Sequence, residues 1–528
     1  MAIGVVYGEV KPLMFNILLS NPQVEKGSFV KVEHEVYGWG LARIEAITRH
    51  LDKNENEIIL ANARTIGYKS GRNILVPKTP FKPGEKVYIA NNELIVDILG
   101  LKKKRAGNIY IGLLEGHDIP VFLDVNKTIN KHLSVLAKTG AGKSYTVSVI
   151  LEELLENDIP IVVIDPHGEY SSLKYANDPD NLEGRDAERV NEGMERYGVL
   201  PKSYADKIIE YSPNVIVNPW AEKLALRPDF TLEELIEIMP MRLSDNQQSI
   251  LHDALHFFKS RAQGYTIRDL IARVELDHSN AKWKVINGLE TLRDSGIFEG
   301  DTIFEEKLVR PGMTSIINLK GTDPKIQQLI VAKLARNLFE ARKLNRIPKF
   351  FFLIEEAHNF CPERGFGSAL SSNILRTIAG EGRKFGFRIG IVSQRPARVD
   401  KNVLSQCNTQ IILKVTNPND LRAIGNSIEG FTSGLEEDIR QLTIGRALVV
   451  GECVEQPIVV DVRVRKTMPI DMIKGGMVRE SEVGKEEVAE ETEMDETREV
   501  IRVTGEEKVK KKKKGLWDKI KPMFIEEE

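Results

Sequence analysis

The sequence predicts an α/β protein in which a parallel-sheet core follows a small β-barrel, carries a helical insertion and ends in a charged tail. Three observations indicate this class. Apolar runs of strand length alternate with helical segments from about residue 128. Residues 1–125 instead hold short apolar runs between Gly, Pro and Asn turns. A glycine-rich loop joins the first of the later runs to a helix. With 528 residues, the chain is also too long for a single ordinary core.

The first region, residues 1–125, is expected to form a small antiparallel β-barrel. Its short runs at 28–32, 41–47, 86–90 and 109–113 are separated by turn residues, and few stretches show helical periodicity. Many short strands without long helices are typical of such a barrel.

The second region, residues 126–475, is expected to form the core. Its continuous apolar runs suit strands that are covered on both faces. Because helices lie between most of these runs, right-handed crossovers and a parallel sheet are predicted. The runs are 133–137, 160–165, 314–319, 350–354, 388–392, 410–414 and 447–450. Residues 225–305 are mostly helical, with periodic segments at 232–239 and 247–260, and form the predicted insertion.

The last region, residues 476–528, is expected to be a charged, disordered tail. Residues 478–507 are dense in Glu and residues 508–514 are almost all Lys, with little apolar content. Near its end stands a short amphipathic cluster formed by Leu516, Trp517, Ile520 and Phe524. This cluster is either part of a solvated tail or a docking peptide for a partner protein or DNA.

Composition restricts the compartment and the class of partner. The formal net charge is −3, so the chain has no global basic bias towards nucleic acid, although a local basic strip is compatible with it. The three cysteines lack the spacing of a zinc site or a disulfide framework, which indicates core residues in a reducing compartment. No signal peptide or membrane-length apolar run is present, so we expect a cytoplasmic protein without a membrane partner.

The strongest motif lies at residues 137–144, AKTGAGKS, which matches the phosphate-binding P-loop except that Ala137 replaces the first glycine. Gly140 and Gly142 allow the backbone to turn successive N–H groups towards a phosphate, and the helix that follows presents its positive end to the same anion. Lys143 is expected to neutralise the β- and γ-phosphates, and Ser144 to ligate Mg²⁺. The core is therefore predicted to be a RecA-like P-loop NTPase that binds ATP and Mg²⁺. The expected nucleotide contacts within the loop are Thr139, Gly140, Ala141, Gly142, Lys143, Ser144 and Tyr145.

A second motif ends the apolar run at 350–354 with two acids, Glu355 and Glu356. Ligands gather at the carboxyl ends of parallel strands, so both acids should face the P-loop. We expect Glu355 to hold the metal and Glu356 to orient and deprotonate the attacking water, which favours hydrolysis over phosphate transfer to a metabolite. Asp is the usual residue at the first of these positions, which puts direct metal contact by Glu355 in question.

Two further strand ends carry polar residues. Asp165 begins the segment DPHGEY after the run at 160–165, and Gln394 follows the run at 388–392, where it is placed to sense the γ-phosphate. The alternative for both is ordinary capping of a loop by a polar side chain.

Taken together, these motifs resemble the HerA family, archaeal relatives of FtsK-type DNA translocases. The resemblance covers residues 1–465 and rests on the β-rich N-terminal region and on KTGAGKS, IDPHGEY, FLIEEAHNF, GEGRKFGFRIGIVSQRP and GRALVVG in this order. It implies a homohexameric ring that moves duplex DNA through its channel, a NurA-type nuclease partner and a role in recombinational repair.

The resemblance also implies basic groups at the nucleotide. Arg383 is the first candidate for an arginine finger acting across the subunit boundary, with Arg395 and Arg422 as alternatives. Lys131 matches a position expected to carry a basic nucleotide contact. Loops at 361–372 and after Tyr170 are candidates for contact with DNA phosphates, since a translocase must move over any sequence.

Two other functions stay open at this point. One is a conjugation- or secretion-type ATPase that pumps protein or DNA, and the other is a non-catalytic ring scaffold gated by ATP. Glu356 argues against the scaffold, because a scaffold has no need to activate water.

Overall fold

The computed structural model describes residues 1–474 apart from 21–23, 52–56, 72, 102, 183, 240, 262–263 and 299–302. The tail expected at 476–528, with its apolar cluster at 516–524, lies outside the described residues.

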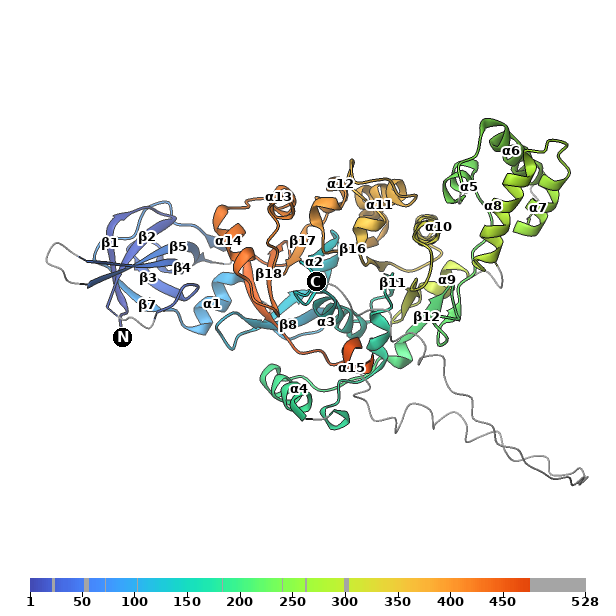
Figure 1. Ribbon diagram of the computed structural model, residues 1–528. Coiled ribbons are helices and arrows are strands. Elements are labelled where there is room, and N and C mark those ends of the chain that lie inside the picture. Colours follow the sequence, from blue (N-terminus) through green and yellow to red (C-terminus); the bar gives the residue numbers. More distant parts are fainter. Residues whose placement is uncertain are drawn as a thin grey trace, which may run out of the picture. The chain divides into compact units, whose positions relative to one another are not determined.

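The N-terminal strands form a closed barrel (Figure 1). The hydrogen-bonded order is β2-β1-β7-β3-β4-β5, and β5 pairs back onto β2 to close it. Alternate residues of these strands point inwards, and Phe15, Val30, Ile44 and Val87 are among those buried inside. This confirms the predicted barrel. The bounds are β1 (Gly4–Val10), β2 (Met14–Leu19), β3 (Phe29–His34), β4 (Gly38–Leu51), β5 (Glu57–Ser70), β6 (Asn73–Leu75) and β7 (Lys86–Ile89).

The barrel is shorter than the boundary at residue 125 implies. Its last strand ends at Ile89 and is followed by α1 (Asn92–Leu99). The next two strands, β8 (Asn108–Leu114) and β9 (Pro120–Asp124), join the second sheet through β19 (Ile458–Val462). All residues of β8 but one are buried, which is typical of a strand covered on both faces, and a short apolar run does not reveal which sheet will cover it.

The second sheet has the order β13-β12-β14-β11-β15-β16-β10-β17-β18-β19-β8-β9. Neighbouring strands from β13 to β17 are parallel, as predicted. The pairs from β17 to β9 are antiparallel, so the sheet as a whole is mixed. The link between β18 and β19 is short, which suits a hairpin but not a parallel crossover. The remaining strands are β10 (Leu133–Leu136), β11 (Ile161–Asp165), β12 (Ile208–Ser212), β13 (Glu222–Lys223), β14 (Thr314–Asn318), β15 (Phe350–Ile354), β16 (Phe387–Ser393), β17 (Thr409–Ile412) and β18 (Arg446–Gly451).

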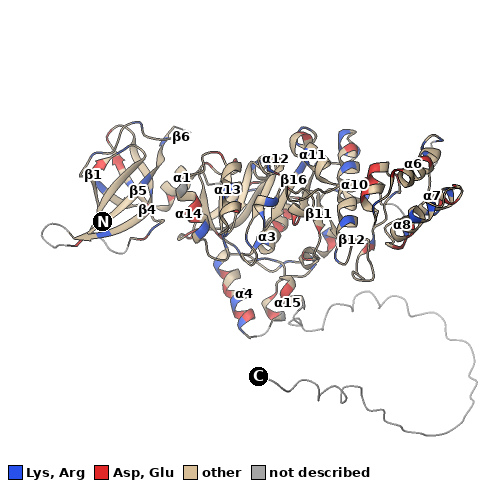
Figure 2. Ribbon diagram, turned by 45° about the horizontal axis from the view of Figure 1, so that its top comes forward, with Lys and Arg blue, Asp and Glu red and all other residues tan. Residues whose placement is uncertain are grey.

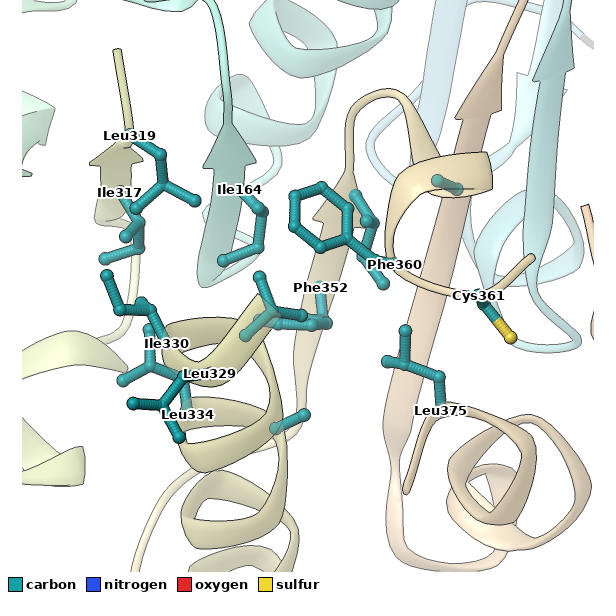
Figure 3. Packing of buried hydrophobic residues seen from close by; sticks show 14 of the residues in the cluster. Ile164, Ile317, Leu319, Leu329, Ile330, Leu334, Phe352, Phe360, Cys361 and Leu375 are labelled. Atoms are coloured by element: carbon teal, nitrogen blue, oxygen red, sulfur yellow. The ribbon is translucent and has the colours of Figure 1, made fainter. Parts of the chain in front are cut away.

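Helices cover both faces of the parallel part. Side chains of α10 (Pro324–Lys343), including Leu329, Ile330 and Leu334, pack on one face together with Phe352 of β15 and Leu375 of α11 (Ser372–Phe385) (Figure 3). Successive residues of a strand point to opposite faces of the sheet, so every second residue of these strands belongs to a different hydrophobic cluster. The cluster on the opposite face includes the buried side chains of α3 (Lys143–Glu156). The three cysteines are free and buried, as expected of core residues.

The helical insertion gathers α5, α6, α7 and α8 into one group (Figure 1). Capping boxes start α5, α6 and α7, with Thr231, Ser244 and Thr266 as the capping residues. Leu251 and Leu270 are fully buried between these helices. The bounds are α5 (Leu232–Ile238), α6 (Asp245–Lys259), α7 (Ile267–Glu275), α8 (Lys282–Asp294) and α9 (Glu305–Leu308).

The other helices are short or lie at the surface. Arg residues are interspersed with Asp and Glu along α4 (Gly184–Tyr197), so neither sign dominates there (Figure 2). Among the described residues, no helix combines the length and the apolar character needed to cross a membrane. The others are α2 (Val125–Ile129), α12 (Lys401–Leu404), α13 (Pro418–Ser427), α14 (Ser433–Gln441) and α15 (Ile470–Lys474), with 3-10 turns η1 (Tyr170–Lys174), η2 (Pro179–Asn181), η3 (Ala205–Lys207), η4 (Ala357–Asn359) and η5 (Pro396–Arg398).

Candidate nucleotide site

The P-loop connects the carboxyl end of β10 to the first turn of α3. Gly140 and Gly142 have φ angles of 76° and 94°, the left-handed region that glycine adopts without strain. The entry to the loop is held by the sheet, since the Ala137 amide donates to the Ser393 carbonyl at 3.2 Å. The methyl group of Ala137 is fully buried in the core, so the fold accommodates the departure from glycine at this position.

The two acids after β15 lie beside the P-loop lysine. Lys143 Nζ contacts Glu355 Oε1 and lies 3.1 Å from Glu356 Oε1. Glu355 is fully buried, and Glu356 and Lys143 are nearly so. Charges interact far more strongly at such a site than in water, so the lysine compensates the burial of both carboxylates.

Glu356 is held from several sides. Its backbone is left-handed, with φ 49° and ψ 46°, which is uncommon outside glycine and aims the side chain out of the strand direction. The amide of Gln394 donates to Glu356 Oε1, and Thr139 of the P-loop donates to Gln394. Gln394 therefore links the P-loop to the acid at the ends of two neighbouring strands.

His358 is a member of this group that sequence reasoning missed. Its Nδ1 lies 3.2 Å from both Glu356 Oε2 and Ser393 Oγ. Burial lowers the pKa of His358, although the nearby Glu356 carboxylate acts in the opposite direction. The available signal was its position in the segment EEAH, two residues after Glu356.

The DPHGEY segment has a different role from the one expected of an acid at a strand end. Asp165 is fully buried and accepts three backbone N–H groups, from His167 at 3.2 Å, Gly168 at 2.8 Å and Tyr170 at 2.9 Å. Burial raises the pKa of Asp165, and these amide donors oppose the rise. Asp165 thus caps its own loop, which is the structural alternative considered for it. The Tyr170 hydroxyl donates to Glu355 Oε2 at 2.6 Å, a contact that the sequence did not reveal.

Ser144 and Glu355 are compatible with Mg²⁺. Ser144 is the second residue of α3, and hydroxyl and carboxylate oxygens are the hard donors that this ion prefers. The described part of the chain contains no cluster of three or more His, Cys, Asp or Glu side chains able to hold a metal alone. This donor set fits an ion that is shared with nucleotide phosphates, as Mg²⁺ usually is.

Tyr145, expected at the nucleotide, contacts Arg465. Its hydroxyl accepts the backbone N–H of Arg465 at 3.0 Å, and its ring lies 5.9 Å from the Arg465 guanidinium. The structure therefore connects Tyr145 to the segment after β19.

Lys131 and Arg383 lie at the amino ends of the parallel strands, opposite to the carboxyl ends that carry the P-loop and the acids. Lys131 precedes β10 and pairs with Glu452, while Arg383 is exposed near the end of α11, just before β16. Both line a cavity of about 430 Å³ at the amino ends of the parallel strands. The structure thus does not bring either residue to Lys143 of the same chain. The cavity is strongly basic and is lined by Asn126, Lys127, Asn130, Lys131, Lys349, Arg383, Lys384, Gly386, Arg388 and Glu452.

The other candidates are exposed. Arg395 follows Gln394 directly at the P-loop edge, whereas Arg422 lies on α13 beside a second cavity. Arg364 is exposed in the loop at 361–372, which follows β15 at the same edge as Glu356.

This fold and this site define the chain as a P-loop NTPase. A family model described as helicase HerA, central domain, matches residues 109–338. The chain is 29% identical to the DNA double-strand break repair helicase HerA of Pyrococcus furiosus over 457 residues, 77% of this chain and 78% of the relative. It is 28% identical to the DNA double-strand break repair helicase HerA of Saccharolobus solfataricus over 509 residues, 90% of this chain and 94% of the relative.

Among solved structures, VirB4 of Thermoanaerobacter pseudethanolicus is similar with a TM-score of 0.47 and 16% identity, over 70% of this chain and 99% of that chain. The family match and the archaeal relatives show that the chain is similar to HerA helicases over most of its length. These relatives are named as helicases, and the P-loop lysine with its buried acid pair supplies the groups that ATP hydrolysis requires.

Proposed function

We propose that this chain is an ATP-driven translocase or helicase that acts on duplex DNA ends during recombinational repair. The observation that carries the proposal is the position of Glu356, a buried acid at the carboxyl end of β15 that lies 3.1 Å from the P-loop lysine. A protein that only binds ATP has no need of such an acid. The names of the archaeal relatives support DNA as the substrate and repair as the setting.

Each residue of the site has a definite task in this proposal. The P-loop amides and Lys143 hold the phosphates, and Ser144 and Glu355 hold Mg²⁺, which supplies charge neutralisation of the phosphates when it is bound. Glu356 orients the attacking water and accepts its proton. Gln394, which contacts both Thr139 and Glu356, is placed to respond to the γ-phosphate.

The basic cavity supports action in a ring. Arg383 lies at the amino edge of the strands and the P-loop at the carboxyl edge, so the arginine cannot complete its own site. In a head-to-tail ring, the amino edge of one subunit can face the carboxyl edge of the next. Arg383 and Lys131 would then reach the phosphates of a neighbouring subunit, as an arginine finger does in other NTPases.

The assembly proposed for this activity is a homohexamer that acts in the cytoplasm with a NurA-type nuclease. The hexamer, the compartment and the nuclease partner are supported by the resemblance in the ordered motifs. The loop at 361–372, with exposed Arg364 and two glycines of positive φ, stays a candidate for contact with DNA phosphates.

The test is the steady-state ATPase rate of the full chain with and without linear duplex DNA, with Lys143→Ala as the inactive control. We expect hydrolysis in the parent chain, stimulation by linear duplex DNA and no turnover in Lys143→Ala. A mass measurement of the assembled particle addresses the ring. A parent rate that is indifferent to DNA would argue for a different cargo, and normal turnover in Lys143→Ala would remove the P-loop assignment itself.

A further inference from the structure

Glu355 is held by a buried tyrosine as well as by the P-loop lysine. Its Oε1 faces Lys143, and its Oε2 accepts the Tyr170 hydroxyl at 2.6 Å. Tyr170 and Glu355 are both fully buried, so the hydroxyl has no competing water and the carboxylate has little freedom to rotate. A hydrogen bond to a charged acceptor in such surroundings is among the stronger ones in proteins.

Tyr170 is in turn fixed by its own loop. Its backbone N–H donates to Asp165 Oδ2 at 2.9 Å, and Asp165 Oδ1 holds the amides of His167 and Gly168. Two residues further on, Ser172 accepts a hydrogen bond from Arg465 at 3.0 Å. The DPHGEY segment is therefore a rigid support, and among the described residues Tyr170 makes its only side-chain contact with the acid pair.

We propose that Tyr170 is a positioning residue for the metal-holding carboxylate, and that it sets the affinity of the site for Mg²⁺-bound nucleotide. The inference rests on the proposed function, because it takes Glu355 as the acid that serves the metal. Residues that orient a metal ligand through a hydrogen bond typically contribute about 10- to 100-fold to metal affinity. The side chain of Glu355 is longer than that of the Asp usual at this position and has one more torsion. The Tyr170 hydroxyl restrains this additional torsion.

Another buried tyrosine provides a matched control. Tyr204 is also almost fully buried, and its hydroxyl donates to Glu156 Oε1 at 2.8 Å. Glu156 is the last residue of α3, whereas the phosphate loop lies at the first. Removing either hydroxyl deletes a tyrosine–carboxylate hydrogen bond, but only Tyr170 touches the acid pair.

The experiment measures the Kd of a fluorescent non-hydrolysable ATP analogue twice for each full-length protein, once in excess Mg²⁺ and once in EDTA. The Kd in EDTA divided by the Kd in Mg²⁺ reports how much the metal strengthens binding, without any turnover. In Tyr170→Phe, we expect this ratio to fall roughly tenfold, with the Kd in EDTA unchanged. Tyr204→Phe should keep the parent ratio. In a Glu355→Gln background, which already lacks the carboxylate, Tyr170→Phe should add little further loss.

The other outcomes distinguish a failure of the positioning role from a failure of the proposed function. An unchanged ratio in Tyr170→Phe, or an equal weakening in Mg²⁺ and in EDTA, overturns the positioning role while the proposed function stands. A parent chain whose binding ignores Mg²⁺ contradicts the proposed function instead. If Tyr170→Phe does not fold, Asp165→Asn serves as the second variant. An amide has a single acceptor oxygen and cannot hold all three N–H groups, so it should loosen Tyr170 and lower the ratio in the same direction, and a parent-like ratio there would overturn the proposal.

Discussion

The chemistry of this chain depends on how a few buried charges are oriented. Glu356 sits in left-handed backbone, a conformation that costs roughly 1–3 kcal/mol for a residue other than glycine. The contacts from Lys143 and Gln394 compensate that cost by holding its carboxylate at the P-loop. Such strain is common where a side chain must be presented for catalysis, and it supports Glu356 as the water-activating acid.

At this position we predict that Glu356→Gln binds ATP as the parent does but hydrolyses it at least about 100-fold more slowly. The amide keeps the size of the side chain and its contact with Gln394, but it cannot accept a proton from water. The rate is measured by phosphate release and the affinity by titration with the fluorescent analogue. Glu429→Gln, at an exposed glutamate, is the control and should leave both unchanged. A parent-like rate in Glu356→Gln would mean that another group activates the water.

Sequence reasoning reached the members of the site that lie next to a recognisable local pattern. Lys143 follows a glycine-rich loop, and Glu355 and Glu356 end an apolar run, so strand-end geometry was enough to bring them together. The contacts of Tyr170 and His358 depend on how separate loops fold back over the sheet. The Tyr170–Glu355 bond spans 185 residues, and nothing in the local sequence encodes it.

At the scale of elements, the helix that carries the P-loop is fastened to the segment after β19 by buried charges. Arg463 is fully buried and lies 2.9 Å from both Glu152 and Glu153 of α3. Burial works against the charge on Arg463, but the two carboxylates outweigh it and raise its pKa. The segment at 463–467 also meets Tyr145 and Ser172 through Arg465, so it touches both the P-loop helix and the Tyr170 turn.

We predict that Arg463→Met lowers the free energy of unfolding by about 3–5 kcal/mol, because two carboxylates are left buried with too little positive charge. The loss is measured by urea unfolding. Arg440→Met, which removes an exposed pair with Glu436, is the control and should change stability little. A loss from Arg463→Met as small as that of the control would show that water or Lys466 takes over the compensation.

A second connection between elements predicts a pH dependence. His132, between α2 and β10, is buried, accepts the Ile389 amide at 2.9 Å and lies 3.1 Å from the Ala379 carbonyl. Burial lowers its pKa from 6.5 to about 4. Between these values the unfolded chain takes up the proton and the folded chain does not, so stability falls as pH falls, by roughly 3 kcal/mol at pH 4.

The measurement is urea unfolding from pH 7 down to pH 4. His132→Asn should flatten the slope in this window, since Asn tolerates the φ of 63° at this position and does not titrate. His256→Asn, at an exposed histidine, should keep the parent slope. An identical slope in His132→Asn and the parent would assign the pH dependence to other groups.

The strands could be predicted from the sequence where all of their residues are buried. The parallel strands were found because continuous apolar runs need cover on both faces, as in β11 and β15. The antiparallel extension was not found, because β8 enters the sheet by pairing with β19, which lies more than 300 residues away in sequence. Such pairing is set by tertiary packing and not by local pattern.

At the scale of the whole molecule, each chain of the proposed ring would contribute to two nucleotide sites, one on each side. The carboxyl edge of the parallel strands carries the P-loop and its acids, and the amino edge carries the basic cavity with Arg383 and Lys131. The net charge of −3 does not reveal the basic cavity, because it is a sum over the whole chain, and on α4, for example, Arg residues are interspersed with Asp and Glu (Figure 2). Two incomplete halves of this kind are what a heterologous ring requires.

This arrangement predicts rescue between two inactive variants. Arg383→Ala and Glu356→Gln should each hydrolyse ATP very slowly alone, because every interface lacks either the finger or the acid. In mixed rings, an interface is complete where the intact Glu356 of an Arg383→Ala subunit meets the intact Arg383 of a Glu356→Gln subunit. Random assortment makes about a quarter of the interfaces complete at equal amounts, so the ATPase rate should pass through a maximum at that ratio.

The control for this rescue mixes Glu356→Gln with a chain that carries both substitutions. No interface there has an intact Glu356, so the rate should stay at the level of Glu356→Gln alone. The two chains are mixed under conditions in which subunits exchange, and phosphate release is then measured as a function of the ratio of the two chains. If the mixture of single variants is as inactive as this control, Arg383 does not act across the interface, and Arg395, which lies at the P-loop edge beside Gln394, becomes the arginine to replace next.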